Sequence, residues 1–410
     1  MDTYSILIFL SGLVIFSYLF DLFARRTSVP AVLLLLGLGI VLRVIADAWS
    51  FRVMDMQLIL PTLGNVGLIL IVLEGALDLE YRPEKRTIIG KAFLSALLIL
   101  LITSAAIAGL LHYITGTEWI ICVANAIPLS VISSAVAIPS VSGQPMERKE
   151  FVVYESSFSD ILGIVFFNFI VSNDSFGLGA FSRLGGEILS VLILSALFSM
   201  ALLWILGRIK HKVKFFLIMA ILVLVYAVGK QFHLSSLVVV LAFGMFLANA
   251  EQLPFEWFKK RFIYPDFKRD LEQFHSLSGE SAFLIRTFFF VVFGYTVILM
   301  QLADRTVILV GMILLAATYV VRALFLKAVL RMDLRPLVYV TPRGLISILL
   351  YFSLPPELKM PGVGLGLLFL MVLGTCLIMA FGLLGDRPLI KGPEEDGPID
   401  VGTLPPEQIT

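Results

Sequence analysis

Long apolar segments separated by short polar stretches run along the chain to about residue 385. Most hold about 20 residues, the length at which a helix rising ~1.5 Å per residue crosses a hydrocarbon core ~30 Å thick. This pattern predicts an all-α polytopic membrane protein with about thirteen transmembrane helices. The predicted helices cover residues 4–23, 30–46, 58–79, 92–114, 119–141, 150–172, 185–206, 215–229, 234–250, 282–302, 307–329, 337–354 and 362–385.

The basic residues agree with this number of helices and predict an orientation. If the N-terminus is outside, the cytoplasmic loops and tail hold 22 of the 31 lysines and arginines, and the opposite loops hold 6. Cytoplasmic loops carry an excess of Lys and Arg in membrane proteins. We therefore expect a multi-pass protein of the cell (inner) membrane, with its C-terminus in the cytoplasm. Segment 4–23 precedes Arg25 and Arg26 and is expected to be a retained helix rather than a cleaved signal.

Composition narrows the class of protein further. Hydrophobic residues make up 59%, charged residues 15%, and the mean hydropathy is +0.97, which excludes a soluble protein. The net charge of +1 says nothing about nucleic acid, but no basic run is long enough to bind phosphates, so no nucleic-acid partner is expected. No Cys or His spacing is typical of a disulfide framework or metal centre, so no cofactor is predicted. Loop 251–280 is amphipathic, and we expect it along the cytoplasmic interface, anchored by Trp257; the tail 386–410 is predicted to be disordered.

The stretch 151–168 (FVVYESSFSDILGIVFFN) places two acids, Glu155 and Asp160, inside an apolar segment. In a helix beginning near residue 149, Asp160 lies ~16 Å along the axis, in the middle of the bilayer. An ionisable group there costs at least ~2.5–3.5 kcal/mol and indicates an ion path or proton site. Ser156 and Ser157 share its helix face and offer neutral oxygens. The alternative, a structural acid paired with a buried base, is stronger for Glu155 than for Asp160.

Two segments carry prolines where a bilayer-spanning helix is expected to unwind. In ANAIPLSVISSAVAIPSVSG, prolines 128 and 139 bracket Ser133 and Ser134, and VYVTPRGLISILLYF is interrupted at residues 341–344. The two segments lie seven predicted helices apart, so equivalent helices would run in opposite directions. Paired interrupted helices in inverted repeats indicate a transporter site. The short loop between segments 119–141 and 150–172 lets Asp160 face the first interruption. The alternative is that the prolines merely kink the two helices without unwinding them.

These motifs resemble those of sodium/proton antiporters of the NhaP type, in the cation:proton antiporter superfamily. The sequence Glu155-Ser156-Ser157-Phe158-Ser159-Asp160 is similar to the family's Glu-Ser-x-x-Asn-Asp motif. The resemblance covers nearly the whole chain to about residue 385. Four further stretches carry it: LILIVLEGALDLE (69–80), FFFVVFGYTV (288–297), VVRALFL (320–326) and TPRGLISILLYFSLP (341–355).

The resemblance assigns roles to individual residues. Asp160 matches the ion- and proton-binding aspartate, the monovalent-cation ligand, and Ser156 matches a serine that helps to bind the ion. Glu155 matches a glutamate that pairs with an arginine, here Arg322, and Arg343 matches the arginine of an Arg-Gly motif at the helix crossing. The family implies a homodimer within residues 1–385, with a dimerisation scaffold (about 1–80 and 215–302) and a moving core (about 88–172 and 306–385).

Two positions depart from the family's pattern. Ser159 replaces the asparagine before the aspartate, and Ser133-Ser134-Ala135 replaces a Thr-Asp-Pro motif. The hydroxyls of Ser133, Ser134 and Ser159 stay candidate cation ligands, but the second acid is absent.

We therefore predict a transporter, not an enzyme, that exchanges Na⁺, or Li⁺ or K⁺, for H⁺ by alternating access. Asp160 would bind cation or proton in competition, and exchange would be electroneutral. The alternative is a sodium-coupled symporter of a small organic solute with a related fold. A membrane-embedded protease would need a second facing aspartate, which is absent. Arg286 is expected to be either a snorkelling interface residue or a site partner, and Glu74 a gate, packing or ion residue.

Overall fold

The computed structural model describes residues 3–27, 29–48, 56–79, 83–141, 143–172, 178–208, 215–231, 236–296, 304–360 and 364–385, and these ranges contain helices joined by turns and links, with no strand. Each predicted apolar segment falls on a helix or on an interrupted helix. The first half contains α1 (Thr3–Thr27), α2 (Ala31–Ala48), α3 (Met56–Leu77), α4 (Arg86–Thr115), α5 (Trp119–Ser130), α6 (Ser134–Ser140), α7 (Met146–Val171) and α8 (Leu178–Arg208). The second half contains α9 (Phe215–Gln231), α10 (Ser236–Ala248), α11 (Glu256–Phe262), α12 (Phe267–Thr296), α14 (Arg305–Phe325), α15 (Leu345–Phe352) and α16 (Leu365–Leu384).

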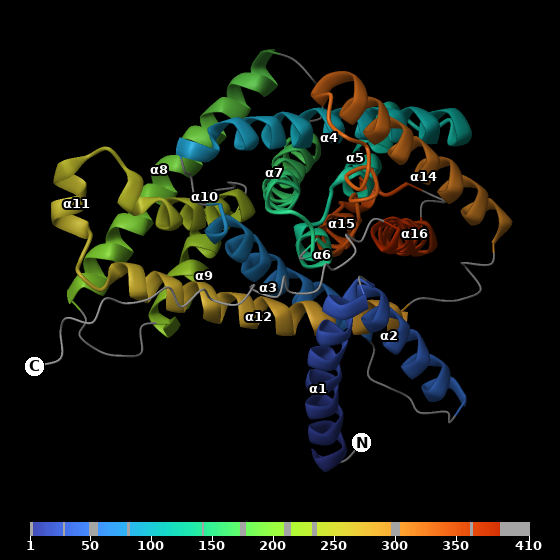
Figure 1. The fold of residues 1–410 in the computed structure, drawn as a ribbon, viewed down its shortest axis with the longest axis horizontal. Coiled ribbons are helices and arrows are strands. Elements are labelled where there is room, and N and C mark those ends of the chain that lie inside the picture. The colour runs from blue at the N-terminus through green and yellow to red at the C-terminus, as the bar shows by residue number, and fades with distance from the viewer. Residues whose placement is uncertain are drawn as a thin grey trace, which may run out of the picture.

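The predicted all-α membrane fold is confirmed. Among the described residues, eight helices are long and apolar enough to cross a bilayer, and shorter apolar helices accompany them. The helices form two neighbouring packing groups. In one, α12 lies against α2 and α3, and α10 packs on α3, α8 and α9; in the other, α4 packs on α5, α7 and α14. Figure 1 shows α5, α6 and α15 meeting between α7 and α16, while α12 runs along one edge with α3.

Both predicted interruptions are present. The first leaves Val131–Ser133 as a non-helical link between α5 and α6. The second differs in detail, because residues 335–339 form only hydrogen-bonded turns before the extended stretch 340–344. Pro336 and Pro342 lie six residues apart, and each removes a backbone donor, so no regular helix forms until Leu345.

The expectation that residues 251–280 form an interfacial loop is wrong for its second half. From Phe267 the chain is already helical and continues into the spanning part of α12 without a break. Phe267 and Phe274 are buried, and Leu271 between them is partly buried. This i, i+4, i+7 spacing gives the helix an apolar face, so the amphipathic pattern extended a transmembrane helix rather than marking a separate surface segment. The tail 386–410 lies outside the described residues.

Candidate functional site

Helix α7 carries the two acids into the centre of the fold. Its side chains at Glu155, Ser156, Ser157, Ser159 and Asp160 are all buried, with Asp160 only 7% exposed. Burial of so many polar groups in one turn and a half is costly unless each finds a partner. The hydrogen-bond partners therefore show which side chains have a structural role and which have atoms free to bind an ion or a proton.

Asp160 is held on one side only. Its Oδ2 accepts a hydrogen bond of 3.1 Å from the backbone N–H of Ser134, the first residue of α6. Its Oδ1 is buried and finds no hydrogen-bond partner in the part of the chain that the structure describes. Buried polar atoms are nearly always paired in native proteins, so an unpaired carboxylate oxygen needs an explanation. The N-terminal end of α6 also favours negative charge at this point.

A small cavity lies against Asp160. The hydroxyl oxygen of Ser157 is likewise buried and unpartnered within the described residues, and it faces the same cavity. The remaining wall is apolar except for Ser134. The lining residues are Ile71, Val72, Gly75, Ser134, Ser157, Asp160, Ile161, Ile164, Leu241 and Ile346. One carboxylate oxygen and one hydroxyl are thus left unpaired at a largely apolar cavity, an arrangement that suits a small hard cation or a proton.

The two interrupted helices cross beside this cavity. The N–H of Ser133 donates to the carbonyl of Pro342 at 2.9 Å, and the N–H of Ile132 donates to the hydroxyl of Ser159 at 2.9 Å. These bonds satisfy backbone donors that the unwound link would otherwise leave orphaned. Gly344 permits the close approach, since a Cβ there would lie 2.8 Å from the Cβ of Ser133.

Arg343 supports the crossing without any carboxylate partner among the described residues. Its guanidinium donates to the carbonyls of Leu129 (2.6 Å) and Val131 (3.2 Å) and to the hydroxyl of Thr341 (3.0 Å). These carbonyls belong to the C-terminal end of α5 and the link after it, where unpaired carbonyls carry partial negative charge. The buried arginine therefore caps the broken helix.

Glu155 and Arg322 form a fully buried ion pair. Nη2 of Arg322 lies 2.8 Å from Oε2 of Glu155, and Nη1 lies 3.1 Å from Oε1. Ser95 on α4 donates to Glu155 Oε1 at 2.5 Å, and Arg322 Nε donates to the carbonyl of Leu337 at 2.8 Å. Four elements therefore meet at one bidentate pair, and neither charge is left free for an ion.

The structure brings together only part of the predicted ligand set. Ser134 and Asp160 line the cavity together, whereas Ser133 packs against Gly344 at the crossing. Ser159 holds the unwound link, as described above. Ser156 donates its hydroxyl to the carbonyl of Val152, one turn earlier in its own helix. Ser133, Ser156 and Ser159 are absent from the cavity wall, and no sequence signal separated them from Ser134 and Ser157.

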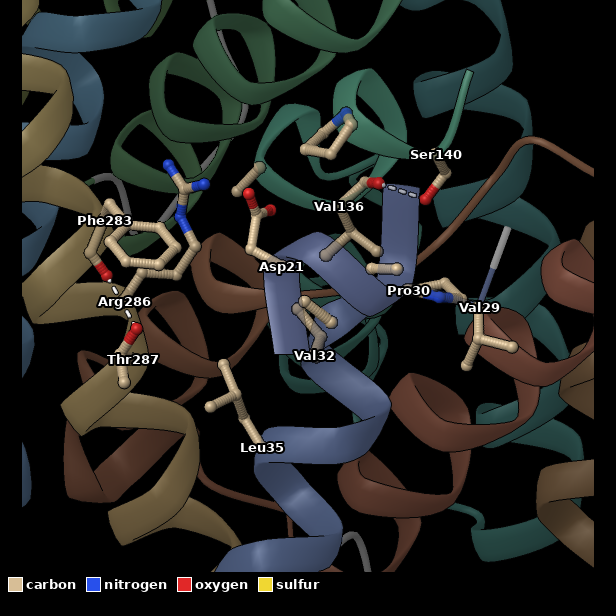
Figure 2. A pocket seen from close by; sticks show the side chains of 14 residues that line it. Asp21, Val29, Pro30, Val32, Leu35, Val136, Ser140, Phe283, Arg286 and Thr287 are labelled. Carbon is tan, nitrogen blue, oxygen red and sulfur yellow. Dashed lines mark hydrogen bonds between the residues drawn. The ribbon is translucent and has the colours of Figure 1, made fainter. Parts of the chain in front are cut away.

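Arg286 has a partner that sequence reasoning missed. Its Nη2 lies 2.8 Å from Oε2 of Glu74, and the two side chains are 15% and 24% exposed, so the snorkelling interpretation is wrong. Arg286 also lines a second pocket, with Asp21 and the α6 residues Val136 and Ser140. In Figure 2, Asp21 and Arg286 point into this pocket from α1 and α12.

A comparison with protein families decides the class. The family described as "Sodium/hydrogen exchanger, transmembrane" matches residues 11–384. The chain belongs to this family. Two solved structures of the sodium proton antiporter MjNhaP1 from Methanocaldococcus jannaschii share the fold. One, at pH 8, has a TM-score of 0.70 and 19% identity over 93% of this chain and 100% of that one. The other has a TM-score of 0.65 and 17% identity over 94% of this chain and 96% of that one. No curated protein sequence matches significantly.

Membership of the sodium/hydrogen exchangers confirms the prediction of a multi-pass cation/proton antiporter. The family is one of transporters and not of enzymes. The comparisons give no support to the alternative of a sodium-coupled symporter.

Proposed function

We propose that Asp160 of this exchanger binds Na⁺ and H⁺ in turn, and that alternating access of this one site exchanges the two ions. The observation that carries the proposal is the unpaired Oδ1 of Asp160, which faces a cavity where the Ser157 hydroxyl is also unpaired. A cation or a proton neutralises the same carboxylate, so the two compete. Li⁺ and K⁺ are the other candidate cations.

Obligatory exchange follows from the cost of moving a charge. An unneutralised carboxylate at the bilayer centre is expensive, so the site crosses between its two states only with an ion or a proton bound. Glu155 cannot substitute for Asp160, because Arg322 holds both of its oxygens. Exchange of one proton for one monovalent cation, and therefore electroneutral transport, is the stoichiometry that a single free carboxylate supports.

The pocket around Asp21 and Arg286 is the proposed access route from the cytoplasm. It is lined by the end of α1, the start of α2, α6 and α12, all of which lie on the cytoplasmic side if the N-terminus is outside. Helix α6 links this pocket to Asp160, because Ser134 contacts the carboxylate while the next two residues line the pocket. We further propose a homodimer in which a core containing α4–α7 and α14–α16 moves against the remaining helices.

The test is proton flux in proteoliposomes driven by gradients of Na⁺, Li⁺ or K⁺. Asp160→Asn keeps the size and the Ser134 contact but removes the charge, and we expect cation-driven flux to disappear. The control is Asp47→Asn, another acid-to-amide change at an exposed carboxylate paired with Arg43. It should leave the flux unchanged. Sustained exchange by folded Asp160→Asn protein would refute the proposed site.

A further inference from the structure

Basic side chains lie at the C-terminal end of α8 and at the C-terminal end of α11. Arg208 is the last residue of α8, and lysines follow at 210, 212 and 214. Lys259, Lys260 and Arg261 form the last turn of α11, which packs against α8 (Figure 1). We call Arg208, Lys259, Lys260 and Arg261 the α8–α11 basic surface.

These four cations form no ion pair within the described ranges, although Glu256 lies one turn before Lys259 and Lys260 in α11. Arg269 nearby, by contrast, lies 3.4 Å from Asp266. Lys260 and Arg261 are exposed, and Arg208 is held over the ring of Trp204, with 3.9 Å between its guanidinium carbon and the ring centroid. Stacking fixes the arginine without neutralising it. A surface of several unpaired cations attracts an external anion.

The same surface carries exposed aromatic side chains. Helix α11 buries Phe258 against Phe246 of α10, with ring centroids 5.7 Å apart. It leaves Trp257 62% and Phe255 53% exposed. An amphipathic helix with lysines and an exposed tryptophan is typical of a segment that lies at the headgroup level of a bilayer. A water-soluble anion would use the cations but would gain nothing from the aromatic rings.

We propose that the α8–α11 basic surface binds anionic phospholipid, with the headgroup phosphate against Lys259, Lys260 and Arg261 and the acyl chains beside Trp257. Clusters of basic residues next to the end of a transmembrane helix bind anionic lipids, and each contributes about a fivefold gain in affinity. This site is separate from the cation site at Asp160, and its existence does not depend on the exchange mechanism.

The experiment measures the melting temperature of the full chain in dodecylmaltoside micelles as phosphatidylglycerol, phosphatidylcholine or sodium phosphate is added. The variant K259Q/K260Q/R261Q removes three charges from the surface. The matched control, R86Q/K91Q/K327Q, removes three exposed charges at helix ends expected on the same side of the membrane. Size-exclusion chromatography and cation-driven proton flux show that both variants are folded.

Phosphatidylglycerol, and not phosphatidylcholine, should raise the melting temperature of the unmodified protein and of the control. In K259Q/K260Q/R261Q the lipid concentration needed for this shift should rise about a hundredfold. An equal loss in the control would show that only general charge attraction operates and would overturn the site. A full response to sodium phosphate, or an unchanged response in K259Q/K260Q/R261Q, would also overturn it.

Discussion

The Glu155–Arg322 pair makes a quantitative prediction about stability. We consider Glu155→Gln, which is nearly isosteric, Arg322→Gln, which shortens the side chain, and the double variant. Both residues are 0% exposed, so removing one charge leaves the other buried without compensation. Breaking a buried pair in this way costs about 3–5 kcal/mol, whereas replacing both partners by neutral groups is often nearly neutral.

The contacts rank the two single variants. In Glu155→Gln the amide oxygen can still accept from Ser95 or from Arg322, so the expected loss lies near 3 kcal/mol. Arg322→Gln also removes the bond from Nε to the carbonyl of Leu337, which then keeps only the bond from the N–H of Val340, and losing this charged donor adds about 1.5–3 kcal/mol. Arg322→Gln should therefore destabilise more. The double variant should lose less than the sum of the singles by at least about 2 kcal/mol, from the compensation just described.

Thermal melting of the detergent-solubilised protein, followed by the fraction that stays soluble and monodisperse, measures these differences. A control is the ion pair Lys85–Glu150, which joins the N-cap of α4 to α7 and whose side chains are 27% and 19% exposed. Its neutral variants should lower the melting temperature much less, because water stabilises the remaining charge. If the losses of Glu155→Gln and Arg322→Gln simply add in the double variant, the two residues do not stabilise the fold as a pair, and the reasoning is refuted.

Three further predictions concern the site. Ser134→Ala and Ser157→Ala should raise the half-saturating Na⁺ concentration for proton flux, whereas Ser133→Ala should not; an equal effect at all three positions would refute the cavity assignment. Gly344→Ala should reduce flux and melting temperature together, since its Cβ would lie 2.8 Å from that of Ser133, and near-normal flux would show that the crossing yields easily. Sodium-driven proton flux should be independent of a membrane potential clamped with potassium and valinomycin. Each uncompensated charge that crosses the membrane would change the free energy by ~2.3 kcal/mol per 100 mV, so a voltage-dependent flux would be easy to detect and would indicate a second titrating acid.

Much of the architecture follows from apolar length and from proline positions, because a bilayer imposes a fixed span and proline removes a donor. The broken segments and the acid at mid-bilayer depth were therefore predictable. Which serines line the cavity could not be predicted. Ser133 and Ser134 are adjacent in the sequence, yet Ser134 faces the cavity and Ser133 faces the helix crossing. Such orientation depends on where the helix restarts.

The ion pair between Glu155 and Arg322 was predictable only through family resemblance, and the pair between Glu74 and Arg286 was not predicted. Glu74 and Arg286 lie 212 residues apart, and nothing in the local pattern links them. The helical start of α12 was missed for a different reason. An amphipathic sequence pattern shows only that one face of a helix is apolar. The pattern is the same whether that face lies on a membrane surface or packs on α10 and its neighbours.

The cap that Arg343 forms on α5 has an electrical consequence for the proposed cycle. Glu155 and Arg322 cancel, so the buried centre of the core carries one fixed positive charge, that of Arg343, and one variable negative charge, that of Asp160. With Na⁺ or with H⁺ bound, the sum is the same single positive charge. In the proposed cycle the membrane field therefore does equal and opposite work on the outward and inward journeys, and a voltage drives no net exchange.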